Sequence, residues 1–218
     1  MELELDERGL VTVVAQDRAS GEVRMVAFAD RTAIDRTIET GLAHFHSRSR
    51  GRLWQKGEES GHVLHVREVW IDCDADAVLY LVDPVGPTCH TGAATCFSRR
   101  VHPAPESSGR AQPVLGALEA TLESRASADA GKSYTRSLLD AGPSKIAAKV
   151  REEADEVGRA LTSETDERVV SEVADLVYHA MVGLIARQRS LRDVALELAR
   201  RFGVSGHDEK ASRQTPTE

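Results

Sequence analysis

The feature that most constrains the fold of this chain is a change in the spacing of its apolar residues near residues 102–113. Before this stretch, runs rich in β-branched residues predict strands at residues 10–15, 23–29, 62–71 and 77–82, with regular alternation over 63–70. One helix is expected at about residues 31–39, ending at Gly41. The stretch itself is rich in Pro, Ser and Gly and lacks an apolar period, which is typical of a linker.

After the linker, apolar residues recur every three or four positions, which predicts helices. Four are expected, over residues 114–124, 146–161, 169–184 and 190–202. The second follows Pro143 and takes Ser144 as its N-cap, and the last begins at Ser190 with Asp193 in a capping box. We therefore predict two domains, a β-rich α+β domain followed by an all-α helical domain. The predicted boundaries are 1–105 for the first domain, 106–113 for the linker, 114–203 for the helical domain and 204–218 for a polar tail.

Charge and composition exclude several classes of function. The net charge of −7 argues against a general binder of nucleic-acid phosphates, and an aromatic content of 4% is low for base stacking. The chain begins with an acidic segment and has no run of eighteen apolar residues, so neither a signal peptide nor a membrane span is expected. Three cysteines cannot all pair in disulfides. We expect a small-molecule enzyme of the cytoplasm, without a nucleic-acid or membrane partner.

The cysteines and an acidic run nearby suit metal binding. Cys73 lies inside the run at residues 72–76, and Cys89 and Cys96 follow. Three thiolates can hold Zn²⁺ with one position open for catalysis, whereas the interleaved carboxylates suit Mg²⁺. On a strand, the aspartates of the run would share one face and Cys73 would lie on the other. The alternative is a turn of solvated aspartates with three small buried thiols.

A set of further motifs accompanies the cysteines, namely Met25-Val26-Ala27-Phe28, residues 37–45, residues 47–58, Ser60-Gly61-His62, residues 72–76, residues 86–92 and Cys96-Phe97. By these motifs, residues 8–100 resemble phosphoribosyl-AMP cyclohydrolase of histidine biosynthesis. This family opens the adenine ring of phosphoribosyl-AMP by hydrolysing the bond between N1 and C6. There are two departures from the pattern: His46 stands where an aromatic residue is expected, and Ala93-Ala94 stands where a basic pair is expected.

The resemblance implies metal ligands and a partner. It assigns zinc to Cys73, Cys89 and Cys96, with Cys73 supplied by the partner subunit of a homodimer, and Mg²⁺ to Asp72, Asp74 and Asp76. Zinc would supply hydroxide near neutral pH. His90, next to a ligand, would relay a proton, although a lone histidine is more often structural.

The basic segment at residues 48–56 would anchor the two substrate phosphates, its alternative being a solvated loop. The residues expected to bind substrate in this half are Arg48, Arg50, Arg52, Trp54, Lys56 and His62.

The helical half carries carboxylates at helical spacing. Glu152 and Glu156 share one helix face, as do Glu172 and Asp175, and Glu153 lies beside the first pair. Antiparallel helices would bring these carboxylates together, and Mg²⁺ with a polyphosphate would neutralise their repulsion. The alternative is that they are glutamates of amphipathic helices that face water.

The pattern E-E-x-x-E followed by E-x-x-D occurs together with Ser133-Tyr134-Thr135, Leu138, Gly142, Lys145-Ile146, Lys149-Val150 and residues 175–179. By these motifs, residues 114–203 resemble phosphoribosyl-ATP pyrophosphatase, and the resemblance implies that the helical domain is an all-α domain of the nucleotide pyrophosphatase type. It implies hydrolysis of phosphoribosyl-ATP to phosphoribosyl-AMP and pyrophosphate, with Mg²⁺ on the five carboxylates and catalytic roles for Glu153 and Glu156. Lys145 and Lys149, one turn apart, would contact phosphates or be solvated.

The product of the second domain is the substrate of the first, so the two resemblances support each other. We therefore predict a bifunctional enzyme for two successive steps of histidine biosynthesis. One alternative is a general nucleotide pyrophosphatase fused to a non-catalytic zinc module. Another is a structural zinc module with a helical dimerisation bundle.

Overall fold

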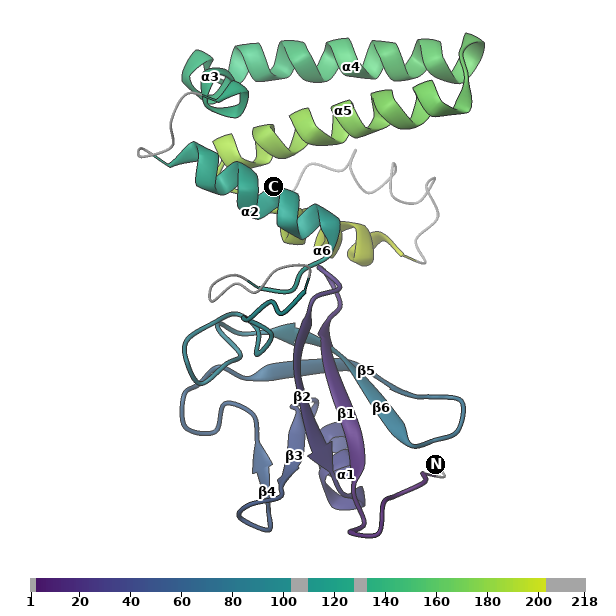
Figure 1. Ribbon diagram of the computed structural model, residues 1–218, viewed down its shortest axis with the longest axis vertical. Helices are drawn as coiled ribbons and strands as arrows, with labels where there is room; N and C mark the ends of the chain where they lie inside the picture. The colour runs from purple at the N-terminus through teal and green to yellow at the C-terminus, as the bar shows by residue number, and fades with distance from the viewer. Residues whose placement is uncertain (1–2, 103–109, 128–132, 203–218) are drawn as a thin grey trace, which may run out of the picture. The chain divides into compact units, whose positions relative to one another are not determined.

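The computed structural model describes residues 3–102, 110–127 and 133–202. It divides into two compact units, Met1–Pro113 and Val114–Glu218. Strands and one short helix form the first unit, and helices alone form the second (Figure 1). The fold class predicted from the sequence is therefore confirmed. The predicted tail and part of the predicted linker lie outside the described residues.

The first unit is built on one six-stranded sheet in the order β4-β3-β2-β1-β6-β5. Its strands are β1 Val11–Asp17, β2 Val23–Ala29, β3 His44–Ser47, β4 Arg52–Gln55, β5 Leu64–Ile71 and β6 Ala77–Pro84. Neighbouring strands are antiparallel except β1 and β6, which are parallel. The sheet curls, because Leu42, just before β3, bridges to His65 of the far edge strand and the Ala43 N–H donates to the Leu64 carbonyl at 3.0 Å.

The runs of β-branched residues predicted β1, β2, β5 and β6, and the structure confirms a strand in each run. Strands β3 and β4 are only four residues long and contain no β-branched residue, so no apolar run predicted them. The predicted regular alternation over residues 63–70 is wrong, because the pairing of β5 with β6 shifts between Val66 and Glu68. Leu64 and Val66 face the core before this bulge, and Val69 faces it after the bulge.

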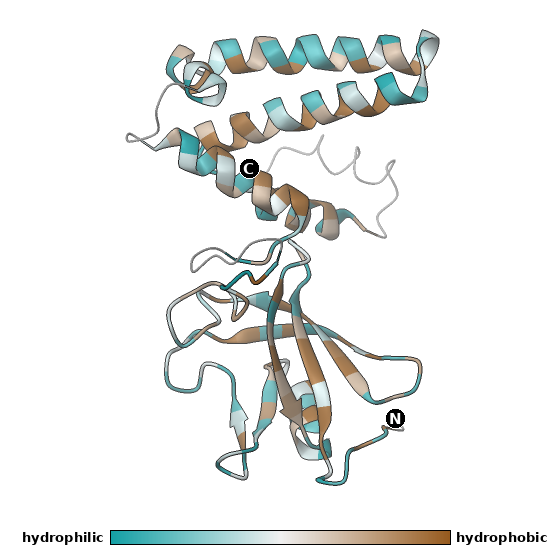
Figure 2. Ribbon diagram, viewed as in Figure 1, coloured by the Kyte–Doolittle hydropathy of each residue, from teal (hydrophilic) through white to brown (hydrophobic). Residues whose placement is uncertain are grey.

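Helix α1, Arg31–Thr40, covers the sheet next to β3. It begins where the Asp30 side chain accepts a hydrogen bond from the Ala33 N–H, and it ends at Gly41 in the left-handed conformation, with φ of 68°. Its buried Ile34 joins a core made by alternate residues of β1 and β6, the apolar segments of Figure 2. The buried core residues are Val11, Val13, Ala15, Met25, Ala29, Ala33, Ile34, Ala43, Phe45, Leu64, Val78, Tyr80 and Val82.

The second unit is a helical bundle. Its helices are α2 Val114–Ala126, α3 Tyr134–Ala141, α4 Pro143–Ser163, α5 Asp166–Ala186 and α6 Leu191–Arg201. The long helices α4 and α5 pack against each other along their length (Figure 1). The core of the unit is formed by Leu122, Leu138, Ile146, Met181 and Val182.

Two details of the helical half differ from the sequence predictions. Ser144 is not an N-cap, because Pro143 already occupies the first turn and Gly142 precedes it without a side-chain cap. Proline suits this position since it has no N–H to satisfy. Helix α3 was not predicted, and the Ser133 hydroxyl caps it by accepting from the Arg136 N–H at 3.1 Å. The predicted capping box of Ser190 with Asp193 is confirmed at the start of α6.

Helix α5 is long and apolar enough to cross a membrane by length and composition alone. It also carries buried Glu172 and His179, and its Met181 and Val182 pack in the core of the bundle. This distribution is typical of a core helix in a helical bundle.

We predict that Ile34 and Ile38, one turn apart on α1, differ sharply in their effect on stability. Ile34 is fully buried and Ile38 is 58% exposed. Replacing Ile34 by Ala should lower the free energy of unfolding by about 2–5 kcal/mol, and the same change at Ile38 by no more than about 0.5 kcal/mol. Urea unfolding followed by tryptophan fluorescence measures the first unit alone, since Trp54 and Trp70 both lie in it. Equal effects of the two changes would contradict this packing.

Candidate functional site

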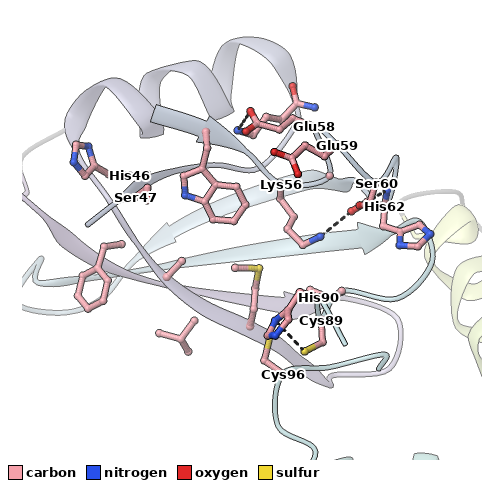
Figure 3. Close-up of a pocket in the computed structure, with 18 of the residues that line it drawn as sticks. His46, Ser47, Lys56, Glu58, Glu59, Ser60, His62, Cys89, His90 and Cys96 are labelled. Atoms are coloured by element: carbon pink, nitrogen blue, oxygen red, sulfur yellow. Dashed lines mark hydrogen bonds between the residues drawn. The ribbon is translucent and has the colours of Figure 1, made fainter. Parts of the chain in front are cut away.

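A cavity of about 790 Å³ opens on the first unit. Its walls come from β2, from β3 and β4 with their connections, and from the loop after β6 (Figure 3). Five of the predicted substrate-binding residues line it, namely Arg48, Arg50, Trp54, Lys56 and His62. Arg52 is not among the lining residues, although its exposed guanidinium pairs at 3.2 Å with Glu58, which does line the cavity.

The loop that carries Cys89 and Cys96 is held against β2. The Cys96 N–H donates to the Arg24 carbonyl at 2.9 Å, and the fully buried Thr95 hydroxyl donates to the Val23 carbonyl at 2.6 Å. Within the loop, the Cys89 N–H donates to the Ala93 carbonyl at 3.0 Å. These bonds bring both thiols to the wall of the cavity, beside His90 (Figure 3).

The Arg24 side chain secures the same loop from inside the sheet. Buried beneath the loop, it donates to the Thr88 hydroxyl at 3.2 Å and pairs with buried Glu22 at 2.7 Å. Sequence reasoning missed this residue. A charged residue within an apolar strand was the available signal, since such residues are rarely buried unless paired.

The two thiols of the cavity differ in their surroundings. A hydrogen bond from the Thr91 hydroxyl, 3.2 Å from the Cys89 Sγ, lowers the pKa of that thiol. Burial raises the pKa of the Cys96 thiol. His90 Nδ1 lies 3.8 Å from the Cys89 Sγ. Two neighbouring sulfur donors with an adjacent imidazole fit a soft or borderline metal such as zinc.

Cys73 lies in a different part of the unit, in the turn between β5 and β6. Cys96 is held by the carbonyl of Arg24, and the next residue, Met25, pairs with Ala15 of β1. Ala15 in turn pairs with Tyr80 of β6, which lies three residues after the start of that strand at Ala77. A strand advances about 3.3 Å per residue, so this register alone places the turn roughly 10 Å away along the strand direction. Cys73 lies beyond that point. One chain therefore does not bring its three thiols to one ion.

The acidic run is a turn, the alternative to the strand geometry considered above, since β5 ends at Ile71 and β6 begins at Ala77. The Ala75 N–H donates to the Asp72 carbonyl, and Ala75 adopts a positive φ of 63°, which ends the strand geometry. The carboxylates of Asp72, Asp74 and Asp76 still converge, with one oxygen from each within 4.8 Å of the others. A hydrogen bond from the Ala77 N–H lowers the pKa of Asp72, and the charge of Asp74 raises the pKa of Asp76. Such an oxygen cluster could hold a hard divalent cation.

In the helical unit, Glu153 and Glu156 of α4 meet Glu172 of α5. One oxygen from each lies within 4.8 Å of the others, and Glu153 and Glu172 are buried. Burial raises the pKa of Glu172. Glu152 and Asp175 are exposed and do not belong to this close group. The structure thus brings together three of the five predicted carboxylates, a set of oxygens that could hold a metal ion.

Basic side chains form ion pairs with this carboxylate group and neutralise part of its charge. Lys149 Nζ lies 3.0 Å from both Glu152 and Glu153, and its hydrogen bond to Glu153 raises its pKa. Arg168 pairs with Glu172 from the preceding turn of α5. Lys149 is therefore engaged by carboxylates rather than solvated, whereas Lys145 is exposed at the start of α4.

Side chains behind the carboxylate group support it, and the sequence analysis assigned them no role in the site. Buried His179 has its Nδ1 2.9 Å from the Asp175 carbonyl and 3.5 Å from Glu153. Its Nε2 lies 3.1 Å from the Tyr134 hydroxyl of α3. The position of His179 seven residues after Glu172, two helical turns along α5, was the signal that could have identified it.

Comparison with known proteins agrees with this division. A family model described as phosphoribosyl-AMP cyclohydrolase matches residues 25–98, and one described as phosphoribosyl-ATP pyrophosphohydrolase matches residues 115–202. The chain is 39% identical to the histidine biosynthesis bifunctional protein HisIE of Wolinella succinogenes, over 97% of this chain and 96% of that protein. It is 44% identical to HisIE of Pyrococcus furiosus, over 88% of this chain and 91% of that protein.

A plant protein gives the same result. The chain is 41% identical to the chloroplastic histidine biosynthesis bifunctional protein hisIE of Arabidopsis thaliana, over 95% of this chain and 78% of that protein. Matches of this length run through both units and the segment between them. The chain therefore belongs to the family of bifunctional histidine-biosynthesis proteins that join a phosphoribosyl-AMP cyclohydrolase domain to a phosphoribosyl-ATP pyrophosphohydrolase domain.

Proposed function

We propose that this protein catalyses two successive hydrolyses of histidine biosynthesis. The helical domain cleaves phosphoribosyl-ATP to phosphoribosyl-AMP and pyrophosphate, and the β-rich domain then opens the adenine ring of phosphoribosyl-AMP. The observation that carries the proposal is that each matched domain contains its own cluster of side chains that could bind a metal ion. Sulfur donors lie in the first domain and a buried carboxylate group in the second.

In the first domain, we assign zinc to Cys89 and Cys96 of one subunit and to Cys73 of another. The separation of the acidic turn from the cysteine loop within one chain supports a homodimer that shares the site. Zinc, when bound, supplies the activation of water at neutral pH. The family's reaction adds water to C6, breaks the N1–C6 bond and moves a proton to N1.

His90 is our candidate for moving that proton. Its Nδ1 lies 3.8 Å from the Cys89 Sγ, so Nε2 is the ring atom available to a water molecule in the cavity. A histidine in this position can accept the proton from water and return it to the leaving nitrogen. Arg48, Arg50 and Lys56 bind the phosphates, and Trp54 and His62 complete the wall around the substrate.

The carboxylates of the first domain and those of the second suit Mg²⁺. We assign one ion to Asp72, Asp74 and Asp76 of the acidic turn. We assign the second-domain ion to Glu153, Glu156 and Glu172, with Glu152 and Asp175 as outer candidates. Mg²⁺, when bound there, supplies charge neutralisation for the polyphosphate.

The side chains of α4 then have distinct tasks. A carboxylate of Glu153 or Glu156 accepts a proton from the attacking water, while Lys149 and Lys145 contact phosphate oxygens. The bond between the first and second phosphorus atoms breaks, and pyrophosphate leaves.

The second candidate function, a general nucleotide pyrophosphatase with a non-catalytic zinc module, requires that the first domain be inactive. We place the enzyme in a reducing cytoplasm, because its three cysteines cannot all pair in disulfides.

Mixing two inactive variants should test the shared zinc site. Cys73→Ser and Cys89→Ser should each abolish cyclohydrolase activity, and their mixture should recover it, because each mixed dimer regains one intact site. Random exchange should return about one quarter of the wild-type rate. The rate is measured by ring opening after the subunits have been mixed and their exchange verified. Exchange without recovered activity would contradict a site shared between subunits.

Removal of zinc should separate the two reactions. A mild zinc chelator, with Mg²⁺ in excess, should abolish ring opening and leave pyrophosphate release unchanged, because all three cysteines lie in the first domain. Both products are measured in the same sample. Parallel loss of both activities would show that the pyrophosphatase site also depends on the chelated metal.

Neutralising Glu153 should damage catalysis more than folding. Glu153→Gln should reduce Mg²⁺-dependent pyrophosphate release by at least the roughly 10- to 100-fold that is lost with an outer-sphere partner of a metal. Asp155→Asn is the matched control, since Asp155 is exposed on the same helix. Unfolding is expected to change little in the metal-free protein, because the substitution relieves like-charge repulsion. Near-normal turnover of Glu153→Gln at saturating Mg²⁺ would remove this site from consideration.

A further inference from the structure

His46 stands where the cyclohydrolase pattern has an aromatic residue, and the structure gives its imidazole a carboxylate partner that a phenylalanine ring could not use. Its Nδ1 lies 2.8 Å from Asp30 Oδ2. The other oxygen of Asp30 accepts the Ala33 N–H at 2.8 Å as the N-cap of α1. Both carboxylate oxygens are therefore fixed. A carboxylate only accepts hydrogen bonds, so the proton lies on Nδ1 and the ring is held in one orientation.

The second ring nitrogen of His46, Nε2, is not engaged by Asp30. Among the described residues, Nε2 of His46 has no hydrogen-bond partner, although its ring belongs to the wall of the cavity. In Figure 3, His46 lies at the end of the cavity remote from Cys89, His90 and Cys96. A ligand contact there would act on a part of the substrate far from the bond that breaks.

Arg48 brings a positive charge to the same place. Phe28 of β2 pairs directly with His46 of β3, and the Arg48 guanidinium carbon lies 3.9 Å from the centre of the Phe28 ring. All three residues line the cavity. Within the part of the chain that the structure describes, Arg48 forms no ion pair with a carboxylate. Stacking on the ring orients the guanidinium and leaves its N–H groups free to bind an anion.

We propose that His46, oriented by Asp30, and Arg48 form a phosphate-binding subsite of the cyclohydrolase cavity. The proposal rests on the proposed function, which supplies a substrate with a phosphate on each of its two ribose groups. In the bound state, Nε2–H of His46 and the guanidinium of Arg48 donate to phosphoryl oxygens, while Nδ1–H of His46 donates to Asp30. The imidazolium then lies between two anions, an arrangement of charge-assisted hydrogen bonds.

This role differs from a purely structural tie between α1 and β3. A structural tie would affect folding and would leave the affinity for phosphate unchanged. A phosphate contact remote from the reacting bond contributes to substrate binding in the ground state and in the transition state alike. Its loss therefore raises KM and leaves kcat almost unchanged.

The test compares His46→Phe, which restores an aromatic ring, with His46→Gln, which keeps an N–H donor. His46→Phe should raise KM for phosphoribosyl-AMP roughly tenfold to hundredfold, the loss of one charge-assisted bond. Inhibition by inorganic phosphate should weaken by the same factor, with kcat within about twofold of wild type. His46→Gln should recover part of both losses. His102→Phe is the control, because His102 is an exposed histidine of the same domain outside the cavity.

A double-mutant cycle with Arg48→Gln tests whether both residues hold one phosphate. Because they share a ligand, the double variant should lose less affinity than the product of the single losses. Asp30→Asn, which keeps the N-cap, should weaken phosphate inhibition in the same direction as His46→Phe. Unchanged KM and unchanged phosphate inhibition in folded His46→Phe would overturn the subsite. Failure of the wild-type enzyme to open the ring would instead overturn the proposed function, and binding of inorganic phosphate by calorimetry would still decide the subsite.

Discussion

The length of the β5–β6 hairpin governs how the first domain can function. The hairpin carries Cys73 in its turn, while Cys89 and Cys96 lie on a loop that is fixed to β2 further along the sheet. Zinc bonds to sulfur are about 2.3 Å long, so three thiolates on one ion lie within a few ångströms of each other. A rigid sheet does not fold its own turn back onto that loop. If the three cysteines share one ion, the complete site requires a second chain, and dimerisation becomes a condition for catalysis.

The opposite situation holds in the helical domain, where one chain suffices to gather the carboxylates. Helices α4 and α5 bring Glu153, Glu156 and Glu172 within 4.8 Å of each other. Repulsion among them is relieved by Lys149 and Arg168 from the same two helices. A divalent cation would take over this neutralisation and release the basic side chains toward phosphate oxygens. Repulsion among the carboxylates lowers the stability of the metal-free domain. Binding of a cation removes this repulsion, and the free energy gained contributes to the affinity for the cation.

The sequence predicted the parts of this structure that repeat regularly. Apolar runs located β1, β2, β5 and β6, and the capping box located the start of α6. Short polar strands such as β3 carry no such pattern. The bulge after Val66 was also invisible, since it depends on pairing with a distant strand. Tertiary context decides features of this kind.

Predictions about the site succeeded where chemistry alone was sufficient and were incomplete where packing mattered. The acidic run predicted a convergence of carboxylates, although a turn and not a strand produces it. Helical spacing grouped Glu152 with Glu156, yet the structure selects buried Glu153 instead, because α5 faces that side of α4. Arg24 and His179 support their sites from positions that have meaning only once the chain has folded.

The two domains use donor atoms of different character, and this separation matters for one chain that is proposed to hold two metals. Thiolates favour zinc strongly over Mg²⁺, whereas carboxylates without sulfur or imidazole donors retain Mg²⁺ at cellular concentrations. His179 shows how the second site keeps this selectivity. Its Nδ1 faces the Asp175 carbonyl and its Nε2 faces the Tyr134 hydroxyl, so both ring nitrogens are already engaged. An imidazole held in this way supports Glu153 without becoming a ligand for zinc, and the carboxylate group remains a site for a hard cation.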